Sequence, residues 1–447
     1  MYAIKKIKLT YTEIIVFGTF GIILIGGLLL SLPISSREEI STPFMDSLFT
    51  AASAFCVTGL VLYDTYTHWS MFGQTVILLL IQIGGLGFMT VITLFSIFLR
   101  RKIGLKERRL LMESANTLKI GGIVLLVKKI IIRTIIFESI GATVLTLRFY
   151  GQMGLKEGLY NGIFHSVSAF CNAGFDLMGK YGQNSSLTSY FNDITVNLTI
   201  MLLIIIGGIG FVVWDDVANN RFLFKKYQLH TKIVLVTTAV LIFGSALIFY
   251  LLEGKYSMIN MGFIEKITAS LFQSVTTRTA GFNTVNLNEM SQGSILMTML
   301  LMVIGGSPGS TAGGIKTTTF IVLLIGAWTT AKQSNEITLF KRRLESDSLK
   351  KASAITVIYL FTAFISIMLI SVMQEFSLVE IMFEVFSALG TVGLSLGITP
   401  SLNILSKIIV TLLMYGGKVG VLSIAIVLAE KKEPSLLSRP LEKIIIG

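Results

Sequence analysis

The feature that most constrains this chain is a series of long apolar runs separated by short polar stretches. Eight runs are long enough to cross the hydrocarbon core of a bilayer, which takes about 20 helical residues. They cover residues 13–32, 71–99, 123–149, 194–214, 230–252, 292–330, 352–373 and 403–429. Charged residues make up 14% of the chain, against about 25% in soluble domains. The sequence therefore predicts an all-α polytopic membrane protein with eight transmembrane helices, and it excludes a soluble globular enzyme.

Lysines and arginines gather in alternate connections between these runs. They precede the first run and follow the second, fourth, sixth and eighth. Because basic residues mark the cytoplasmic side, we expect a multi-pass protein of the cell membrane with both termini in the cytoplasm. The net charge of +12 thus reflects topology and membrane lipid, and it indicates no nucleic-acid partner.

The connections on the opposite, outer side contain a repeated pattern. Short runs at 42–58, 157–173, 263–280 and 378–392 are too short to cross a membrane and are typical of re-entrant helices. Each run leads into a glycine, and these four glycines are 115, 107 and 112 residues apart. This spacing predicts four span, pore-helix, span repeats around one pseudo-fourfold pore.

The repeats divide the chain into five segments. Their expected bounds are a cytoplasmic N-terminus at 1–12, repeats at 13–110, 111–229 and 230–345, and a fourth repeat with the cytoplasmic C-terminus at 346–447.

The four repeated glycines allow two interpretations. A glycine after a short helix can be a simple C-cap, or it can let membrane helices pack closely. Four such turns in register with a repeat favour a second interpretation, in which glycine permits the backbone to face its carbonyl groups toward a common axis. A ring of carbonyl oxygens can replace the hydration shell of a cation. The negative ends of the short helices would favour a cation at the same place.

The middle of the sixth apolar run contains five glycines and one proline within ten residues. A helix kink needs fewer. A phosphate-binding loop is disfavoured because Ile315 stands where its lysine is required. We therefore expect an unwound segment that lies across the pore and acts as a gate. Its residues are Gly305, Gly306, Ser307, Pro308, Gly309, Ser310, Thr311, Ala312, Gly313 and Gly314.

Lys418 is a cation in the interior of the eighth run. A charge at this depth is costly and usually functional, and we expect it to be an electrostatic partner of the gate. Snorkelling to the membrane interface is the alternative. Arg278 and Lys316 lie beside the third turn and in the gate segment, where we expect them to satisfy nearby carbonyl or carboxylate groups.

The four repeats and the glycine-rich third inner helix resemble the Trk/Ktr/HKT superfamily of potassium transporters, and most of all the membrane subunit of the bacterial Ktr system. The resemblance runs from about residue 13 to the C-terminus. It implies a potassium filter at the four turns, a gate at the loop and no covalent cofactor. The implied filter residues are Val57, Thr58, Gly59, Leu60, Asn172, Ala173, Gly174, Phe175, Thr279, Ala280, Gly281, Phe282, Val392, Gly393 and Leu394.

Two positions bear on what this resemblance implies. A sodium-preferring plant branch carries serine where this chain has Gly59, which favours potassium. The family usually carries arginine at the position of Lys418, so the positive charge is retained while the forked donor geometry of arginine is lost.

The resemblance also implies a homodimer and a separate cytosolic ring that binds ATP and ADP. The basic stretches 100–109 and 341–351 are candidate docking surfaces for such a ring, or ordinary anchors on the cytoplasmic side.

The predicted function is potassium uptake by channel-like conduction through the filter. A sodium-coupled secondary transporter is the alternative, although many such transporters use inverted repeats and these repeats share one orientation. No Ser-His-Asp set or pair of carboxylates is visible in the sequence, so we expect no enzyme activity, and the only metal expected is potassium at the filter.

Overall fold

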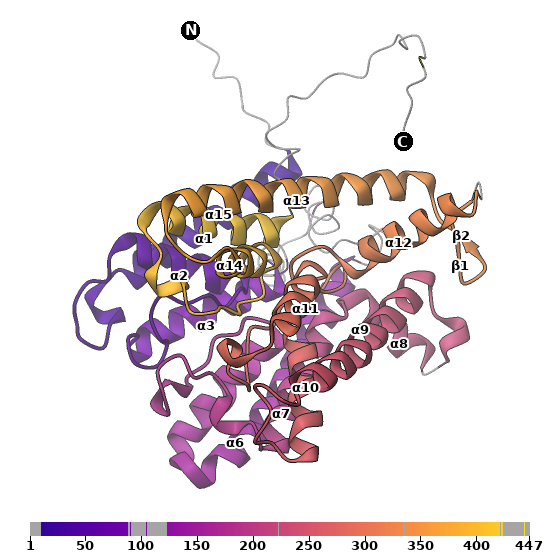
Figure 1. The fold of residues 1–447 in the computed structure, drawn as a ribbon. Helices are drawn as coiled ribbons and strands as arrows, with labels where there is room; N and C mark the ends of the chain where they lie inside the picture. The colour runs from indigo at the N-terminus through magenta and orange to yellow at the C-terminus, as the bar shows by residue number, and fades with distance from the viewer. Residues whose placement is uncertain are drawn as a thin grey trace.

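The computed structural model describes residues 10–87, 90, 104, 123–221, 223–333, 336–420, 422 and 442. The regular secondary structure of these described residues consists of helices and one small antiparallel strand pair, joined by loops (Figure 1). Its helices are α1 Tyr11–Leu30, α2 Phe44–Cys56, α3 Met71–Leu86, α6 Ile123–Phe170, α7 Ile194–Gly208, α8 Phe211–Asn220, α9 Leu229–Glu253, α10 Phe263–Thr276, α11 Gln292–Val303, α12 Thr317–Ala331, α13 Ser346–Met373, α14 Leu378–Gly390 and α15 Ile404–Val419; the strands are β1 Thr338–Leu339 and β2 Arg342–Arg343. Most of the predicted N-terminal segment 1–12, the basic stretch 100–109 and the C-terminal segment after Gly420 lies outside the described residues.

Three helices in the described ranges are long and apolar enough to cross a membrane. They cover Glu13–Leu30, Leu229–Glu253 and Asp347–Met373, and a fourth span results if α7 and α8 are taken together. The second and eighth predicted runs continue beyond Leu86 and Val419 into residues that are not described. The apolar helices agree with a membrane protein, while the number of eight spans stays a prediction.

The sequence predicted one span for the fourth apolar run, but the structure divides this run into two helices. Helix α7 ends at Gly208, and α8 leaves it at an angle of 95°. Gly210 between them has a φ of 96°, which glycine adopts without the steric cost that a β-carbon would add. Asp215 on α8 then pairs with Lys129 and Arg133 of α6, at 2.9 and 3.3 Å.

The sixth run is broken where its glycines predict a break. Helix α11 ends at Val303 and α12 begins at Thr317, and the segment between them contains no helix. A single parallel bridge joins Ile304 to Ile315, so the two ends of the segment lie side by side. We call residues 304–316 the intramembrane loop.

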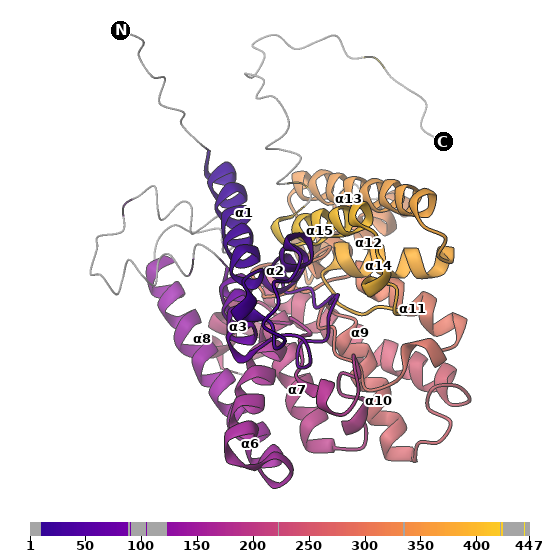
Figure 2. The ribbon, with the colours of Figure 1, turned by 90° about the vertical axis from the view of Figure 1, so that its left-hand side faces the viewer.

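Each of the four short helices packs against longer neighbours; the second of them is the part of α6 after Gly154, whose φ of 76° interrupts that helix. α2 contacts α1 and α3, α6 contacts α7, α10 contacts α9, and α14 contacts α13 and α15. Contacts between successive groups run from α3 to α6, from α7 to α10, from α11 to α14 and from α15 back to α2. The helices therefore close into a circuit, in which the yellow and indigo ends of the chain lie side by side (Figure 2).

The same local signal starts each of the four inner helices. A polar side chain caps the N-terminus and accepts a hydrogen bond from the backbone N–H three residues later, which satisfies one of the unpaired amides of the first turn. The capping residues are Ser70, Asp193, Ser291 and Asn403.

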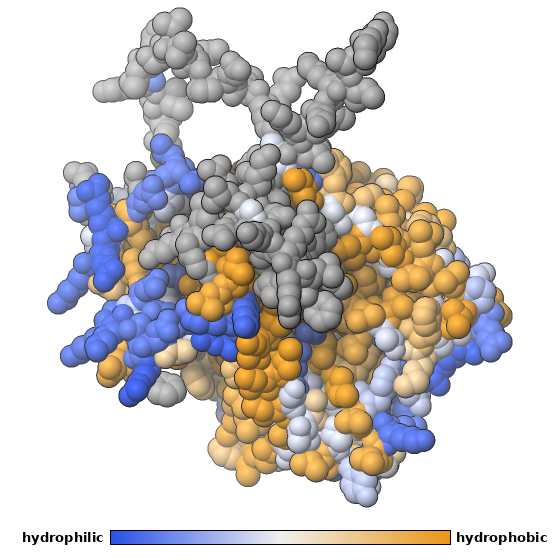
Figure 3. Space-filling view, turned by 180° about the vertical axis from the view of Figure 1, so that it is seen from behind, coloured by the Kyte–Doolittle hydropathy of each residue, from blue (hydrophilic) through white to orange (hydrophobic). Residues whose placement is uncertain are grey.

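The outer surface of the bundle is apolar over a wide area. Phe243 and Leu251 of α9 are 68% and 71% exposed, and Val372 of α13 is 83% exposed. One face shows an extended apolar area with hydrophilic side chains toward its two edges (Figure 3). Exposed apolar surface of this extent is what a lipid-facing protein requires.

Candidate functional site

The four predicted filter segments share one pattern of positive φ after their short helices. The residue two positions before the glycine has a left-handed φ, and the glycine itself has a positive φ. The values are 51° and 94° for Val57 and Gly59, 59° and 72° for Asn172 and Gly174, 67° and 80° for Thr279 and Gly281, and 53° and 91° for Thr391 and Gly393. A non-glycine residue in the left-handed region raises the free energy of the backbone by about 1–2 kcal/mol. Residues strained in this way cluster at functional sites, where the surrounding structure holds them in place.

The four turns meet one another in a closed circuit. In each case the space of a missing β-carbon is taken by the carbonyl group that precedes the next glycine. A β-carbon would lie 2.6 Å from the Ala173 oxygen at Gly59, 2.7 Å from the Ala280 oxygen at Gly174 and 2.6 Å from the Val392 oxygen at Gly281, and it would overlap the Thr58 oxygen at Gly393. These positions therefore require glycine because of close backbone approach as well as φ.

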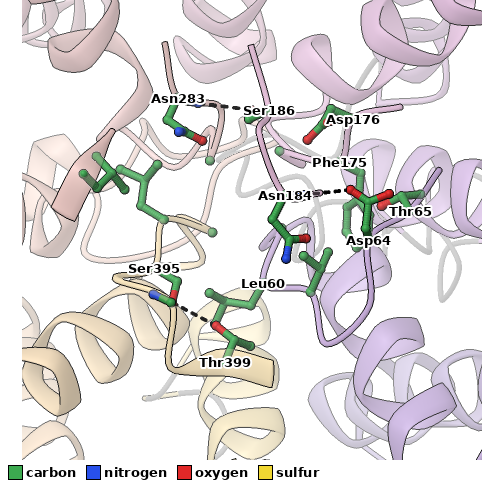
Figure 4. A pocket seen from close by; sticks show the side chains of 18 of the residues that line it. Leu60, Asp64, Thr65, Phe175, Asp176, Asn184, Ser186, Asn283, Ser395 and Thr399 are labelled. Carbon is green, nitrogen blue, oxygen red and sulfur yellow. Dashed lines mark hydrogen bonds between the residues drawn. The ribbon is translucent and has the colours of Figure 1, made fainter. Parts of the chain in front are cut away.

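All four glycines line one cavity of about 260 Å³. Leu60, Phe175 and Leu394 from the predicted filter line it as well, whereas Phe282 is fully buried outside the lining. The remaining lining comes from the loops that follow the turns, which converge on the cavity from several repeats (Figure 4). The structure thus brings the four predicted turns to one opening.

Two carboxylates stand at this opening (Figure 4). Asp64 Oδ2 accepts a hydrogen bond of 3.0 Å from the Asn184 backbone N–H and so ties the first outer loop to the second. Burial raises the pKa of the Asp176 carboxyl to about 7, and the negative charge of Asp64 adds to the rise, against the hydrogen bond donated by the Met178 N–H.

Side chains of the short helices hold the turns from behind. The Ser53 hydroxyl accepts a hydrogen bond from the Gly59 N–H, and Ser387 does the same for Gly393, both at 3.1 Å. In the second repeat the Ser168 hydroxyl donates to the Phe175 carbonyl at 2.6 Å. These bonds limit the freedom of the backbone at the opening.

Each repeat also carries a pair of adjacent glycines after its turn, and these pairs have a packing role; they are Gly84 and Gly85, Gly207 and Gly208, Gly305 and Gly306, and Gly416 and Gly417. A β-carbon on Gly84, Gly207 or Gly417 would overlap the carbonyl oxygen of Phe55, Phe170 or Leu389 at the end of a short helix. The pairs therefore let an inner helix touch the end of the short helix ahead of it. In the third repeat Gly305 faces the carbonyl of Gly313 in the intramembrane loop instead.

The intramembrane loop lies against the inner ends of two turns. Its Thr311 hydroxyl is 3.2 Å from Asn172 Oδ1 and 3.4 Å from the Phe170 carbonyl oxygen. A β-carbon on Gly313 would overlap the side chain of Thr391. Thr311 and Gly313 therefore contact the second and the fourth turn.

The loop is also bound to the broken helix of the second repeat. The Ser307 N–H donates to the Gly208 carbonyl at 3.0 Å, and the Phe211 N–H donates to the Gly309 carbonyl at 2.8 Å. Gly210 has no room for a side chain, because a β-carbon there would lie 2.7 Å from the Pro308 carbonyl oxygen. The break after α7 thus makes room for the loop.

Both lysines predicted at the loop bind its carbonyl groups. Lys418 Nζ donates to the Thr311 carbonyl at 2.7 Å, which excludes the snorkelling alternative for this conformation. Lys316 Nζ donates to the Ala312 carbonyl at 2.6 Å, as expected of a residue that satisfies nearby carbonyl groups.

Arg278 differs from the expectation in one respect. It is 5% exposed and donates to the Thr238 hydroxyl at 3.3 Å. Within the described ranges it forms no ion pair with a carboxylate, and its Nε has no hydrogen-bond partner.

Sequence reasoning missed a buried carboxyl group beside the second turn. Glu138 of α6 accepts a hydrogen bond of 3.2 Å from Gln82 Nε2 of α3, and its Oε1 lies 3.9 Å from the Cys171 sulfur. The available signal was an acidic residue within an apolar run, which is rare and usually functional.

The chain matches known proteins over nearly its whole length. Residues 20–438 match the TrkH family, described as a cation transport protein. The Ktr system potassium uptake protein B of Bacillus subtilis is 43% identical, covering 97% of this chain and 96% of that protein. The potassium/sodium uptake protein NtpJ of Enterococcus hirae is 38% identical, with 98% of each chain covered.

A solved structure agrees at the level of the fold. The potassium transporter TrkH from Vibrio parahaemolyticus aligns with a TM-score of 0.74 at 16% identity, covering 96% of this chain and 87% of that one. Together with the four turns around one cavity and the apolar outer surface, these matches show what the chain is. It belongs to the TrkH family of cation transport proteins and is an ion transporter rather than an enzyme.

Proposed function

We propose that this chain carries potassium into the cell through a single pore formed by its four repeats. The observation that carries the proposal is the closed circuit of turns, in which each filter glycine faces a carbonyl group of the next turn. The circuit of helix contacts supports the same pseudo-fourfold arrangement and eight spans. Carbonyl oxygens gathered around one axis replace the hydration shell of the ion.

The intramembrane loop is the gate in this proposal. It is supported by the contacts of Thr311 and Gly313 with the inner ends of two turns, where the loop would block an ion leaving the filter. Lys418 holds the loop through the Thr311 carbonyl. Its positive charge also opposes the passage of a cation, at a cost of roughly 3 kcal/mol at 6 Å for an effective dielectric constant near 20.

A second candidate is potassium transport coupled to sodium. One relative carries both ions in its name, as a potassium/sodium uptake protein. Influx that requires a sodium gradient and saturates with it would favour coupling, whereas influx driven by the potassium gradient alone favours conduction.

The assembly we propose is a homodimer in the cell membrane, with both termini in the cytoplasm. Two relatives are named components of a Ktr system, which supports a separate regulatory partner, and we propose that this partner is a cytosolic ring that binds ATP and ADP. The strand pair β1 and β2 carries Arg342 and Arg343, two basic residues of the candidate docking stretch 341–351.

Rubidium influx into proteoliposomes tests the gate. Deleting residues 308–312 removes Thr311, which contacts the second turn and accepts the hydrogen bond of Lys418, so partner-free influx should rise by at least tenfold over the intact protein. Protein density and folding are matched by size-exclusion chromatography. Influx at or below that of the intact protein would mean that the loop does not limit conduction.

A further inference from the structure

A buried carboxyl group without an ion pair lies where the first repeat contacts the second. Glu138 of α6 is 9% exposed, and its Oε2 accepts a hydrogen bond of 3.2 Å from Gln82 Nε2 of α3. Its Oε1 lies 3.9 Å from the Cys171 sulfur. Asp46 and Asp215 differ from it, because each of them pairs with a lysine or an arginine at 2.6–3.3 Å. Glu138 is thus an acid that no ion pair neutralises in the described part of the chain.

The partners of Glu138 suit both charge states of its carboxyl group. The Gln82 amide donates through Nε2 to a carboxylate, and its Oε1 can accept from a neutral carboxyl group. The Cys171 thiol is 3.8 Å from Gln82 Oε1 and 3.9 Å from Glu138 Oε1, so it can donate to either oxygen. A carboxylate buried without a cation carries a large desolvation cost, which the neutral form avoids. The cluster therefore favours a proton on Glu138 unless a nearby cation offsets the charge.

Cys171 connects this carboxyl group to the second turn. It directly precedes Asn172, the residue of that turn with a left-handed φ of 59°. Its sulfur fills the space beside Gly85 of α3, where a β-carbon would lie 2.5 Å from it. Glu138 therefore lies behind one of the four turns that line the cavity. A negative charge at this place attracts a cation that the turn holds, because charges interact strongly in a medium of low dielectric constant.

The helices around Glu138 bring few other charges to it. α7 and α3 pack against α6 and contain no acidic, basic or histidine residue. On α6, Lys129 and Arg133 are already bound to Asp215. Lys418 of α15 is the described cation whose charge acts on the Cys171 thiol. Apart from Lys418, the cation that could favour the ionised form of Glu138 is one held by the turns.

We propose that Glu138 is a proton-binding site coupled to the cation in the filter. Its carboxyl group is neutral when the filter is empty, and it releases its proton to the aqueous phase when potassium occupies the turns. This inference rests on the proposed function, because it requires a cation held by the four turns. It adds that protons and potassium compete, since each lowers the affinity for the other by the same factor. Low pH therefore weakens potassium binding from behind the second turn.

Equilibrium binding of rubidium to the purified protein tests this competition. The background is Asp176→Asn, so that the carboxyl group at the outer opening does not contribute. Lowering the pH from 9 to 6 should weaken rubidium binding to this parent about threefold to tenfold. Glu138→Gln keeps hydrogen-bonding groups but no titratable proton, so its affinity should be the same at both pH values and match the low-pH value of the parent. Glu138→Asp keeps the acid and should retain the pH dependence.

Infrared difference spectroscopy adds a readout that needs no substitution at Glu138. Replacing choline by potassium should weaken the C=O band of a neutral carboxyl group and strengthen the carboxylate bands. Cys171→Ala should shift the position of the weakened band, because it removes a contact of the Glu138 carboxyl group. The assignment therefore holds even if Glu138→Gln does not fold. A merely structural Glu138 would give no potassium-dependent carboxyl band.

The failures of this inference and of the proposed function are distinguishable. Rubidium affinity that is independent of pH in the parent, or equally dependent on pH in Glu138→Gln, would overturn the proton site and leave the pore standing. A spectrum without a potassium-dependent carboxyl band, or with one that Cys171→Ala leaves in place, would do the same. Rubidium that neither binds to nor enters through any folded variant would refute the proposed function and this inference with it.

Discussion

At the scale of single residues, two charges stand at opposite ends of the candidate pore. Lys418 binds the Thr311 carbonyl of the loop, and Asp176 lines the outer cavity. A lysine bound to a carbonyl group stabilises one conformation of a segment. A carboxyl group at an opening changes the local concentration of cations. Each charge therefore predicts a different effect on transport.

Removing the charge of Lys418 should open the gate in part. A hydrogen bond from a charged donor contributes about 1.5–3 kcal/mol, so Lys418→Gln is expected to raise partner-free rubidium influx about tenfold or more, and stimulation by the partner should shrink. Lys418→Arg keeps the charge and serves as the control. Equal influx through Lys418→Gln and the parent, at equal protein density, would make this lysine structural.

The carboxyl group of Asp176 should make uptake depend on external pH. Because its pKa is raised to about 7, the group is neutral below that pH and negative above it. The KM for rubidium should therefore fall as the external pH rises from 6 to 8, since a negative opening concentrates cations. Asp176→Asn should remove this dependence. A pH profile that is the same in both proteins would assign the effect elsewhere.

The residue contacts also show what sequence could not supply. Gly59, Gly174, Gly281 and Gly393 were singled out by their spacing and by their place after four short apolar runs, because a repeat leaves a pattern in the sequence, and the family resemblance implied their role in a filter. The contact of Thr311 with Asn172 was not predicted, because these residues are 139 positions apart and no sequence pattern relates the loop to the second turn. Hydrogen bonds between distant segments depend on packing that a single sequence does not encode locally.

At the scale of secondary-structure elements, helix breaks were harder to predict than helices. The break in the sixth run was predicted, because five glycines and Pro308 fall within ten residues. The break between α7 and α8 was missed, because the apolar run continues through Gly210 and hydropathy does not report φ. Its reason became visible only with the loop, which fills the space beside Gly210.

The contact between α15 and α2 closes the circuit and should be sensitive to mutation. Lys407 of α15 pairs with Asp46 of α2 at 2.6 Å, and their side chains are only 14% and 10% exposed. Lys407→Met leaves a buried carboxylate with only the Tyr63 hydroxyl bond of 2.8 Å, at a cost of about 3–5 kcal/mol.

The measurement is the temperature of unfolding in detergent, which should fall clearly in Lys407→Met. The double variant Lys407→Met with Asp46→Leu should recover most of the loss, since no unpaired charge remains. A single variant as stable as the parent would show that this pair does not hold the fourth group of helices to the first.

At the scale of the whole molecule, the repeats explain both the fold and the site. Four similar segments in one chain place four turns around one cavity, so all parts of the proposed filter come from a single polypeptide. The repeats have also diverged: the third inner helix opens into a loop, and the fourth carries Lys418 against it. In the proposed mechanism, the third and fourth repeats therefore supply the gate of the pore.

If the circuit of glycine turns selects potassium, a side chain added to any of its glycines should change the ion selectivity of transport. Rubidium and sodium influx are compared for Gly59→Ser, Gly174→Ser, Gly281→Ser and Gly393→Ser. Gly154→Ser is the matched control, because Gly154 also has a positive φ of 76° but no atom lies within 4 Å of its missing β-carbon. Each of the four variants should lose much of its preference for rubidium over sodium, by about tenfold or more, while the control keeps it. Unchanged selectivity in all four filter variants would contradict this role of the circuit.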